Sequence, residues 1–214
     1  MDNKWFSAPN CTAVTVKKYT SISDHTVLAQ VTIQDAAVAQ KMAETIESIP
    51  TQGNRERKFA AETEQLDLEF TCNGKSEIIH FFDQRIKTPS TFFHSNKIDA
   101  ETKIFTDLAT LLNPEISRPI LKIRGLEISY SDFTFMYTGG KSSNSPEGST
   151  ASGVQENFRI KDKEGNEQTL EITSGQLPPE PMEFKVGDSI YALNSYETKN
   201  RFRLFPDYIQ IVKR

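Results

Sequence analysis

The chain has 214 residues, 36% hydrophobic and 25% charged, with a net charge of −4 and a mean hydropathy of −0.51. This composition is typical of a globular protein, and its apolar runs are far shorter than the roughly 20 residues of a membrane-spanning helix. Residues 1–114 carry 12 basic and 15 acidic groups, and residues 115–214 carry 13 and 14. Neither half has the positive excess of a nucleic-acid-binding domain, so we expect no nucleic-acid partner and no transmembrane segment.

Residues 1–11 are expected to form an N-terminal tail before the first strand. They begin Met-Asp-Asn-Lys-Trp-Phe, which lacks the apolar h-region of a signal peptide. Asp-Asn-Lys is also compatible with the residues that follow the lipid-modified cysteine of an envelope lipoprotein. We therefore expect a periplasmic or cell-envelope protein whose signal and lipid anchor are absent from this chain; a cytoplasmic protein is the alternative.

The first half alternates between strand and helix patterns. Alternating β-branched residues predict strands over 12–19 and 27–33. Asp35 stands where a helix N-cap belongs, and residues at helical spacing form the buried face of that helix: Val38, Met42, Ile46 and Ile49. Strand patterns around 66–70 and 77–82 flank Asn73-Gly74, a strong hairpin signal.

A second helix is predicted between Asp99, as its N-cap, and Asn113-Pro114, because the residue before proline disfavours the helical conformation. Its buried stripe consists of Ile104, Leu108, Leu111 and Leu112. Residues 12–113 are therefore expected to form an α+β domain in the order ββαββα, with an antiparallel sheet and two helices on one face.

Residues 114–214 show strand-like alternation and no helical period, which predicts a small all-β barrel or sandwich domain. Residues 139–153 read GGKSSNSPEGSTASG, a composition that buries no apolar surface, so we expect a disordered loop. Its length favours a functional loop, whereas a tolerated insertion at a hairpin tip is the alternative.

The chain has two cysteines. Cys11 would begin the first strand and Cys72 would end the third, so the two are disulfide candidates within one small sheet. A bridge would imply an oxidising compartment, whereas two unpaired thiols would fit a cytosolic protein.

No catalytic or metal-binding pattern is evident, so we expect no cofactor, no metal and no enzymatic activity. Gly140-Lys141-Ser142 resembles the end of a phosphate-binding loop, but Phe135 occupies the position of its first glycine. The histidines, His25, His80 and His94, lack the spacing of a metal site. Carboxylate pairs two residues apart are expected on solvated strand faces: Glu62 with Glu64, and Asp67 with Glu69.

Two clusters are candidates for partner binding. Phe92, Phe93 and His94 lie in an expected loop, where aromatic residues make good interface anchors. Their alternative is that one phenylalanine fills the core beneath the loop. The second cluster combines basic and aromatic residues on an expected hairpin, whose alternative is an ordinary charged hairpin: Tyr196, Lys199, Arg201 and Arg203.

We therefore expect a non-enzymatic bacterial accessory protein that binds a protein partner, such as an inhibitor or immunity-type protein of the cell envelope. One alternative is a hydrolase-type enzyme whose residues converge from distant positions, with His80, His94, Asp83 and Glu77 as the first to test. A nucleic-acid-binding β-barrel is the other. No family resemblance accompanies these expectations.

Overall fold

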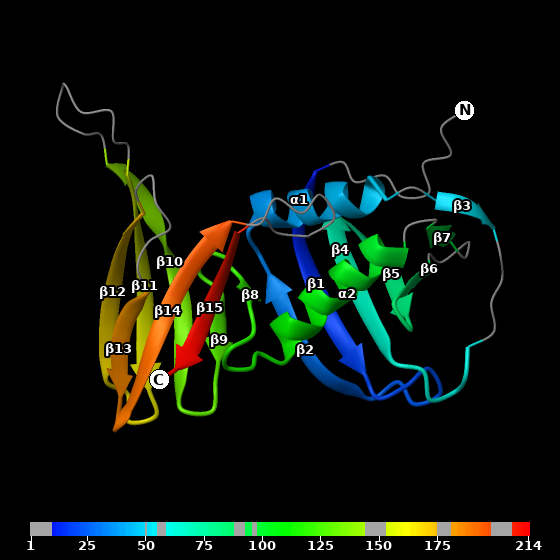
Figure 1. Cartoon of the computed structure of the whole chain (residues 1–214). Helices are drawn as coiled ribbons and strands as arrows, with labels where there is room; N and C mark the ends of the chain where they lie inside the picture. The colour runs from blue at the N-terminus through cyan, green and yellow to red at the C-terminus, as the bar shows by residue number, and fades with distance from the viewer. Residues whose placement is uncertain are drawn as a thin grey trace. The chain divides into compact units, whose positions relative to one another are not determined.

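Figure 1 shows the computed structural model of the chain. The structure describes residues 10–49, 51–54, 59–87, 93–95, 98–143, 153–174, 181–197 and 207–214. These residues form two compact units that meet in the sequence between Leu112 and Asn113.

The first unit is built on a five-stranded antiparallel sheet with the order β2-β1-β4-β5-β6. A separate antiparallel pair is formed by β3 (Thr51–Asn54) and β7 (Phe93–Ser95). The strands of the main sheet are β1 (Cys11–Tyr19), β2 (Val27–Ile33), β4 (Gln65–Cys72), β5 (Lys75–Phe82) and β6 (Arg85–Lys87).

Two helices accompany this sheet. The N-cap prediction for α1 (Ala36–Glu47) is confirmed, because Asp35 Oδ1 accepts backbone hydrogen bonds from the second and third helical residues at 2.9 and 3.1 Å. The second helix, α2 (Ile98–Leu112), ends directly before Asn113-Pro114, as predicted. It begins one residue before Asp99, so the prediction of Asp99 as the cap is wrong.

The helices pack on the apolar face of the sheet: α1 contacts β1, and α2 contacts β1, β2 and β6. In Figure 1, α2 crosses in front of the strands. Burial of a large apolar side chain stabilises the fold by about 1.5–3 kcal/mol, so this face supplies most of the unit's stability. Its fully or almost fully buried strand residues are Val14, Val16, Leu66, Leu68, Phe70, Ile79, Phe81 and Ile86.

The predicted ββαββα domain is wrong. Three further strands, β3, β6 and β7, interrupt that order, and the described chain is mostly β, with fifteen strands and two helices. Asp83 and Gln84 connect β5 to β6 with φ values of 47° and 63°, the left-handed pair of a type I′ turn. That turn contains no glycine, and a strand of three residues gives no alternation, so the sequence carries no clear signal for β6.

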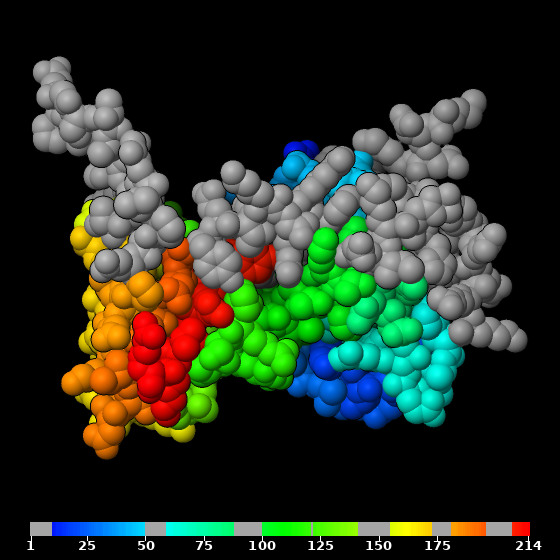
Figure 2. Space-filling view, viewed as in Figure 1, coloured from blue at the N-terminus to red at the C-terminus, as the bar shows by residue number. Residues whose placement is uncertain are grey.

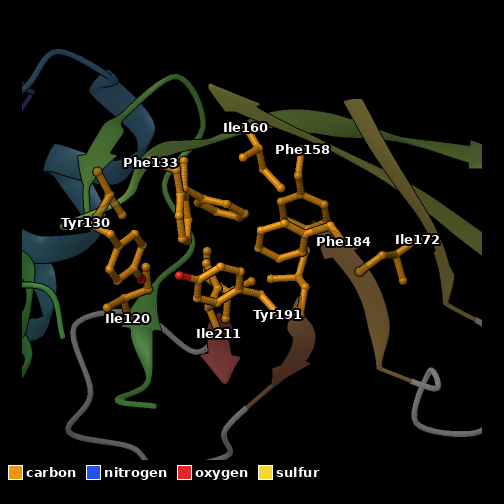
Figure 3. Close-up of a cluster of buried hydrophobic side chains, with 13 residues drawn as sticks. Ile120, Tyr130, Phe133, Phe158, Ile160, Ile172, Phe184, Tyr191 and Ile211 are labelled. Atoms are coloured by element: carbon orange, nitrogen blue, oxygen red, sulfur yellow. The ribbon is translucent and has the colours of Figure 1, made fainter. Parts of the chain in front are cut away.

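The second unit contains two four-stranded antiparallel sheets, with the orders β12-β11-β10-β9 and β13-β14-β15-β8. One core cluster draws residues from both sheets, so they pack face to face as a sandwich. In Figure 3, Phe133 and Phe158 of one sheet meet Phe184 and Tyr191 of the other. The strands are β8 (Ile120–Leu121), β9 (Glu127–Ser129), β10 (Phe133–Ser143), β11 (Gly153–Asp162), β12 (Glu167–Ser174), β13 (Met182–Val186), β14 (Ser189–Glu197) and β15 (Asp207–Lys213).

The expected loop over 139–153 is shorter than predicted. Strand β10 continues to Ser143 and β11 begins at Gly153, and these two residues face each other at the end of the β10–β11 ladder. A bulge between Tyr137 and Gly139, where Gly139 has φ 125°, lets the ladder absorb the glycine pair. Composition alone does not predict this extension of β10, because the partner strand supplies its hydrogen bonds. Residues 144–152 of the expected loop lie outside the described residues.

The second unit also buries an ion pair. Lys122 Nζ lies 2.5 Å from Glu156 Oε1, and their side chains are 10% and 7% exposed. Ser195 donates to the other carboxylate oxygen at 2.8 Å, and the Lys122 ammonium also lies over the Tyr137 ring, 5.5 Å from its centroid. Both charges therefore have partners, as buried charges require.

Candidate functional site

The residues predicted to bind a partner are only partly described. The backbones of Phe93 and His94 belong to β7, which pairs with β3, and the backbone of Tyr196 belongs to β14, opposite Tyr208. Their side chains lie outside the described part of the chain, as do the whole residues Phe92, Lys199, Arg201 and Arg203. The binding roles of all seven stay predictions.

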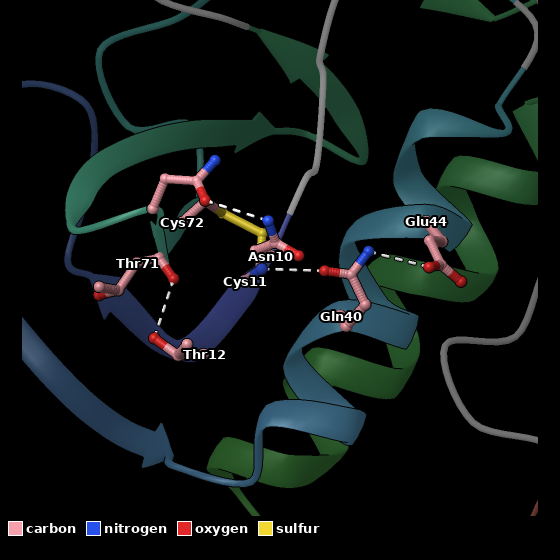
Figure 4. Close-up of a disulfide and its surroundings, with 8 residues drawn as sticks. Asn10, Cys11, Thr12, Gln40, Glu44, Thr71 and Cys72 are labelled. Carbon is pink, nitrogen blue, oxygen red and sulfur yellow. Dashed lines mark hydrogen bonds between the residues drawn. A yellow bond between two sulfur atoms is a disulfide. The ribbon is translucent and has the colours of Figure 1, made fainter.

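Cys11 and Cys72 form a disulfide, with their sulfur atoms 2.02 Å apart. The bridge joins facing residues at the start of β1 and the end of β4, where Figure 4 shows it beside α1. The backbone N–H of Cys11 donates to Gln40 Oε1 at 2.9 Å, and Gln40 in turn donates to Glu44. The bridge thus fixes the N-terminal end of β1 to β4 at the point where β1 meets α1.

The face of the first sheet opposite the helices carries ordered charges. Lys17 and Glu69 form an ion pair at 2.8 Å, and Ser76 donates to the same carboxylate at 2.7 Å. These hydrogen bonds, from Lys17 and then from Ser76, lower the pKa of Glu69. The bond to Glu69 raises the pKa of Lys17. Both side chains are about one-third exposed, so solvent screens the pair.

Asp67 is buried on the same face. His80 Nδ1 lies 2.7 Å from Asp67 Oδ1, and Gln65 donates to that oxygen at 2.8 Å. Burial, followed by the Asp67 charge, raises the pKa of the nearby Tyr19 hydroxyl. The expectation that Asp67 lies on a solvated strand face is therefore wrong. Its side chain is buried, with cross-strand neighbours on β1 and β5.

The Asp67–His80 pair orients an imidazole through Nδ1, an arrangement that general bases require. Among the described residues, no serine, threonine or cysteine side chain donates a hydrogen bond to the other ring nitrogen of His80. The ring instead stacks on Phe82, with centroids 5.8 Å apart. The Asp67–His80 pair thus links facing residues of β4 and β5 on this face of the sheet.

The other residues proposed for a convergent enzyme do not gather around His80. Glu77 lies three residues earlier in β5, so the two side chains point to opposite faces of the sheet. Asp83 is exposed in the turn after β5. The His94 side chain lies outside the described residues.

The free edge of β2 is the most unusual surface feature among the described residues. β2 lies at the edge of its sheet and pairs with β1 alone. Val27 and Leu28 at its start are 44% and 59% exposed, and only one other large apolar side chain of the described chain is exposed, Ile190 at 37%. Figure 2 shows the blue hairpin between β1 and β2 reaching the surface beside green α2.

Strand β2 also lacks the charges that normally protect an edge. Its sequence is VLAQVTI, without a charged residue or a proline. The other described edge strands longer than four residues, β12 and β13, both carry charges, and the three-residue β6 carries two. Natural proteins place charges on edge strands to prevent pairing with another chain, so an uncharged edge is suited to such pairing.

Sequence reasoning missed this edge. The absence of charge over 27–33 is readable in the sequence. The edge position is not, because it depends on β1 lying between β2 and β4, and β4 follows about 30 residues later. A strand without charge is equally typical of a buried central strand.

No protein-family model matches the chain, and neither the curated proteins nor the solved structures that were compared contain a match. Neither helix among the described residues is long and apolar enough to cross a membrane. Within the same residues, no group of three or more histidine, cysteine, aspartate or glutamate side chains is placed to hold a metal ion.

Proposed function

We propose that this protein acts by binding another polypeptide at the free edge of β2, as an added strand. The observation that carries the proposal is a seven-residue edge strand without charge whose first two residues are exposed and apolar. Backbone N–H and C=O groups on such an edge provide affinity, and side-chain contacts on either face provide selectivity.

Binding explains the described surface better than catalysis does. The Asp67–His80 pair is the strongest acid–base arrangement among the described residues, and a second hydrogen bond to Asp67 comes from the Gln65 amide. The β2 edge, in contrast, has no strand on its outer side among the described residues and carries no charge, which suits the addition of another strand.

An oxidising compartment such as the cell envelope fits this proposal. The Cys11–Cys72 disulfide supports that location, because thiols in the cytosol are normally kept reduced. The partner would accordingly be a polypeptide exposed to the same compartment.

The test is quantitative capture from the native host with three tagged baits: the wild type, Leu28→Glu and Gln34→Glu. Leu28 is exposed on β2 and Gln34 is exposed just after it, so both variants add one carboxylate without opening the core. We expect the wild type and Gln34→Glu to capture a polypeptide in stoichiometric amount; an untagged copy of the chain counts as such a polypeptide. Leu28→Glu should capture at least tenfold less of it. Equal capture by all three baits, or no stoichiometric polypeptide on the wild type, would contradict the proposal.

A further inference from the structure

We propose that the chain modifies itself by an isopeptide bond between the Lys122 amine and the Asp207 side-chain carboxyl, with Glu156 as the proton carrier. The bond joins the segment after β8, the first strand of the second unit, to β15, its last strand. This inference is independent of the binding edge at β2.

The backbone brings Lys122 and Asp207 face to face. The register of β8 and β15 pairs Ile120 with Ile209, and the Lys122 backbone N–H donates to the Asp207 carbonyl at 3.1 Å. Both isoleucines are buried in the core of the sandwich. Because side chains alternate along a strand, Lys122 and Asp207, two residues further on, share this interior face, in agreement with the 4.0 Å between Lys122 Nζ and Asp207 Oδ2.

Glu156 reaches the same amine from β11, in the facing sheet. Its Oε1 lies 2.5 Å from Lys122 Nζ, and its Oε2 accepts a hydrogen bond from Ser195 at 2.8 Å. An amine, an oriented carboxylate and a second carboxyl therefore meet at one point, and a base held beside the nucleophile is what activates it. Since two hydrogen bonds fix Glu156, we assign it as the base and Asp207 as the carboxyl that reacts.

Little water reaches the amine and its base. Lys122 and Glu156 are 10% and 7% exposed, whereas the Asp207 side chain is 37% exposed. The Lys122 ammonium lies over the Tyr137 ring, and burial, followed by the Glu156 charge, raises the pKa of the Tyr137 hydroxyl. Exclusion of water strengthens the interactions among the reacting groups and protects the product from hydrolysis.

The reaction consumes no cofactor and no oxidant. Glu156 takes one proton from the Lys122 ammonium and passes it to the Asp207 carboxylate, and the neutral amine then attacks Asp207 Cγ to form the C–N bond. A second proton moves from the nitrogen through Glu156 to the departing oxygen, the C–O bond breaks, and one water molecule leaves. Ammonium and carboxylate become an uncharged amide, and Glu156 ends as it began.

The three charged side chains seen in the structure are the state before the bond forms. Stability effects that concern the Lys122–Glu156 ion pair alone refer to that state. The amide replaces the ion pair with a covalent link between the two ends of the second unit.

Mass spectrometry of the full chain, incubated folded at neutral pH and then unfolded with its disulfide reduced, tests the proposal. We expect the wild type to lack the mass of one water molecule, and its proteolytic digest to contain the Lys122 and Asp207 peptides as one branched species. Asp207→Ala leaves the Lys122–Glu156 pair in place and should keep its full sequence mass. Glu156→Gln keeps an acceptor for Ser195 and should form the link at least about tenfold more slowly.

The chain contains its own control. Lys161 Nζ lies 3.7 Å from Glu167 Oε1, but both side chains are 49% exposed, so we expect this pair to stay unlinked in the same digest. Circular dichroism checks that each variant is folded; if Glu156→Gln does not fold, the wild-type digest and Asp207→Ala still decide. A wild type of full sequence mass, a mass loss that maps to other residues, or a folded Glu156→Gln that links as fast as the wild type would overturn the inference.

Discussion

The two units differ in how their sheets are covered. The sandwich of the second unit has two sheets packed face to face, and its buried ion pair, Lys122 with Glu156, also accepts a hydrogen bond from Ser195 of the other sheet. The first unit has a single main sheet: one buried ion pair, Arg85 with Glu101, joins its strand β6 to α2, and Lys17 and Glu69 on the face away from the helices remain about one-third exposed. It leaves one edge, β2, without any charge at all.

The difference indicates where each unit obtains its stability and where binding is expected. In a sandwich, the apolar faces of two sheets bury each other, so contacts in its interior supply most of its folding stability. A single sheet with helices on one face has no second sheet packed against it, and here a disulfide adds a covalent restraint. The predictions below test this contrast, beginning with the largest expected effect.

Removal of the disulfide, by Cys11→Ser with Cys72→Ser, should destabilise the first unit alone. The bridge closes a loop with a sequence separation of 61 residues, for which chain entropy predicts about 4 kcal/mol. Hydrogen exchange followed by mass spectrometry, with peptides from each unit, gives the two stabilities separately. A loss of equal size in the second unit, or none in the first, would show that the bridge does not act as described.

Lys122→Met should destabilise the second unit by about 3 kcal/mol, because it leaves a buried carboxylate without its cation. Hydrogen exchange of peptides from the second unit, followed at increasing urea concentration, measures the change in the free energy of unfolding. The matched control is Lys122→Met with Glu156→Gln, which removes both charges and should recover most of the loss while Ser195 keeps a hydrogen-bond acceptor. If the double variant is no more stable than the single one, the ion pair is not the cause.

Asp67→Ala and Glu69→Ala compare a buried carboxylate with one that is about one-third exposed, two residues apart on one strand face. Asp67→Ala removes the acceptor shared by His80 and Gln65 and should cost about 2 kcal/mol. Glu69→Ala breaks a screened ion pair and should cost less than about 1 kcal/mol. Thermal unfolding of the two variants checks the order, and equal losses would contradict the role given to burial.

Tyr130→Phe should have the smallest effect at neutral pH and a growing one in alkali. The Tyr130 hydroxyl is buried without a hydrogen-bond partner in the described structure, so its removal should leave stability unchanged or raise it by up to about 1 kcal/mol. Burial raises the pKa of Tyr130 far above its ordinary value. The stabilising contribution of the protonated form is therefore complete below about pH 10 and is lost as pH rises from there towards the folded-state pKa.

The free energy of unfolding, measured at increasing pH in the alkaline range, tests the direction of this effect. Tyr130→Phe should retain more of its neutral-pH stability above pH 10 than the wild type does. Tyr191→Phe is the control, because it loses a hydrogen bond to Asp132 at 2.7 Å and should be less stable at neutral pH by about 1 kcal/mol. Identical alkaline curves for Tyr130→Phe and the wild type would contradict the buried-hydroxyl account.

Features fixed by neighbouring residues could be predicted from the sequence. The cap at Asp35, the turn at Asn73-Gly74 and the end of α2 before Pro114 each depend on a few adjacent side chains and on backbone preferences. Strand positions 27–33 were also readable from alternation. These signals act over at most one turn of helix or one hairpin.

Features fixed by strand order could not be predicted. The burial of Asp67 depends on the register that places His80 opposite it, and the exposure of the β2 edge depends on a partner strand distant in the sequence. The ladder over 139–143 likewise exists because β11 returns beside it, although its composition is typical of a loop. Cross-strand pairing overrides local propensity in each case.

The most direct test of the binding edge is amide hydrogen exchange of the chain alone and in complex with the polypeptide that the wild type captures. We expect the amides of β2 to become more protected in the complex, while those of the charged edge strands β6, β12 and β13 keep their exchange rates. Exchange in β2 that does not change on binding, or protection that appears at one of the charged edges instead, would contradict a binding site at β2.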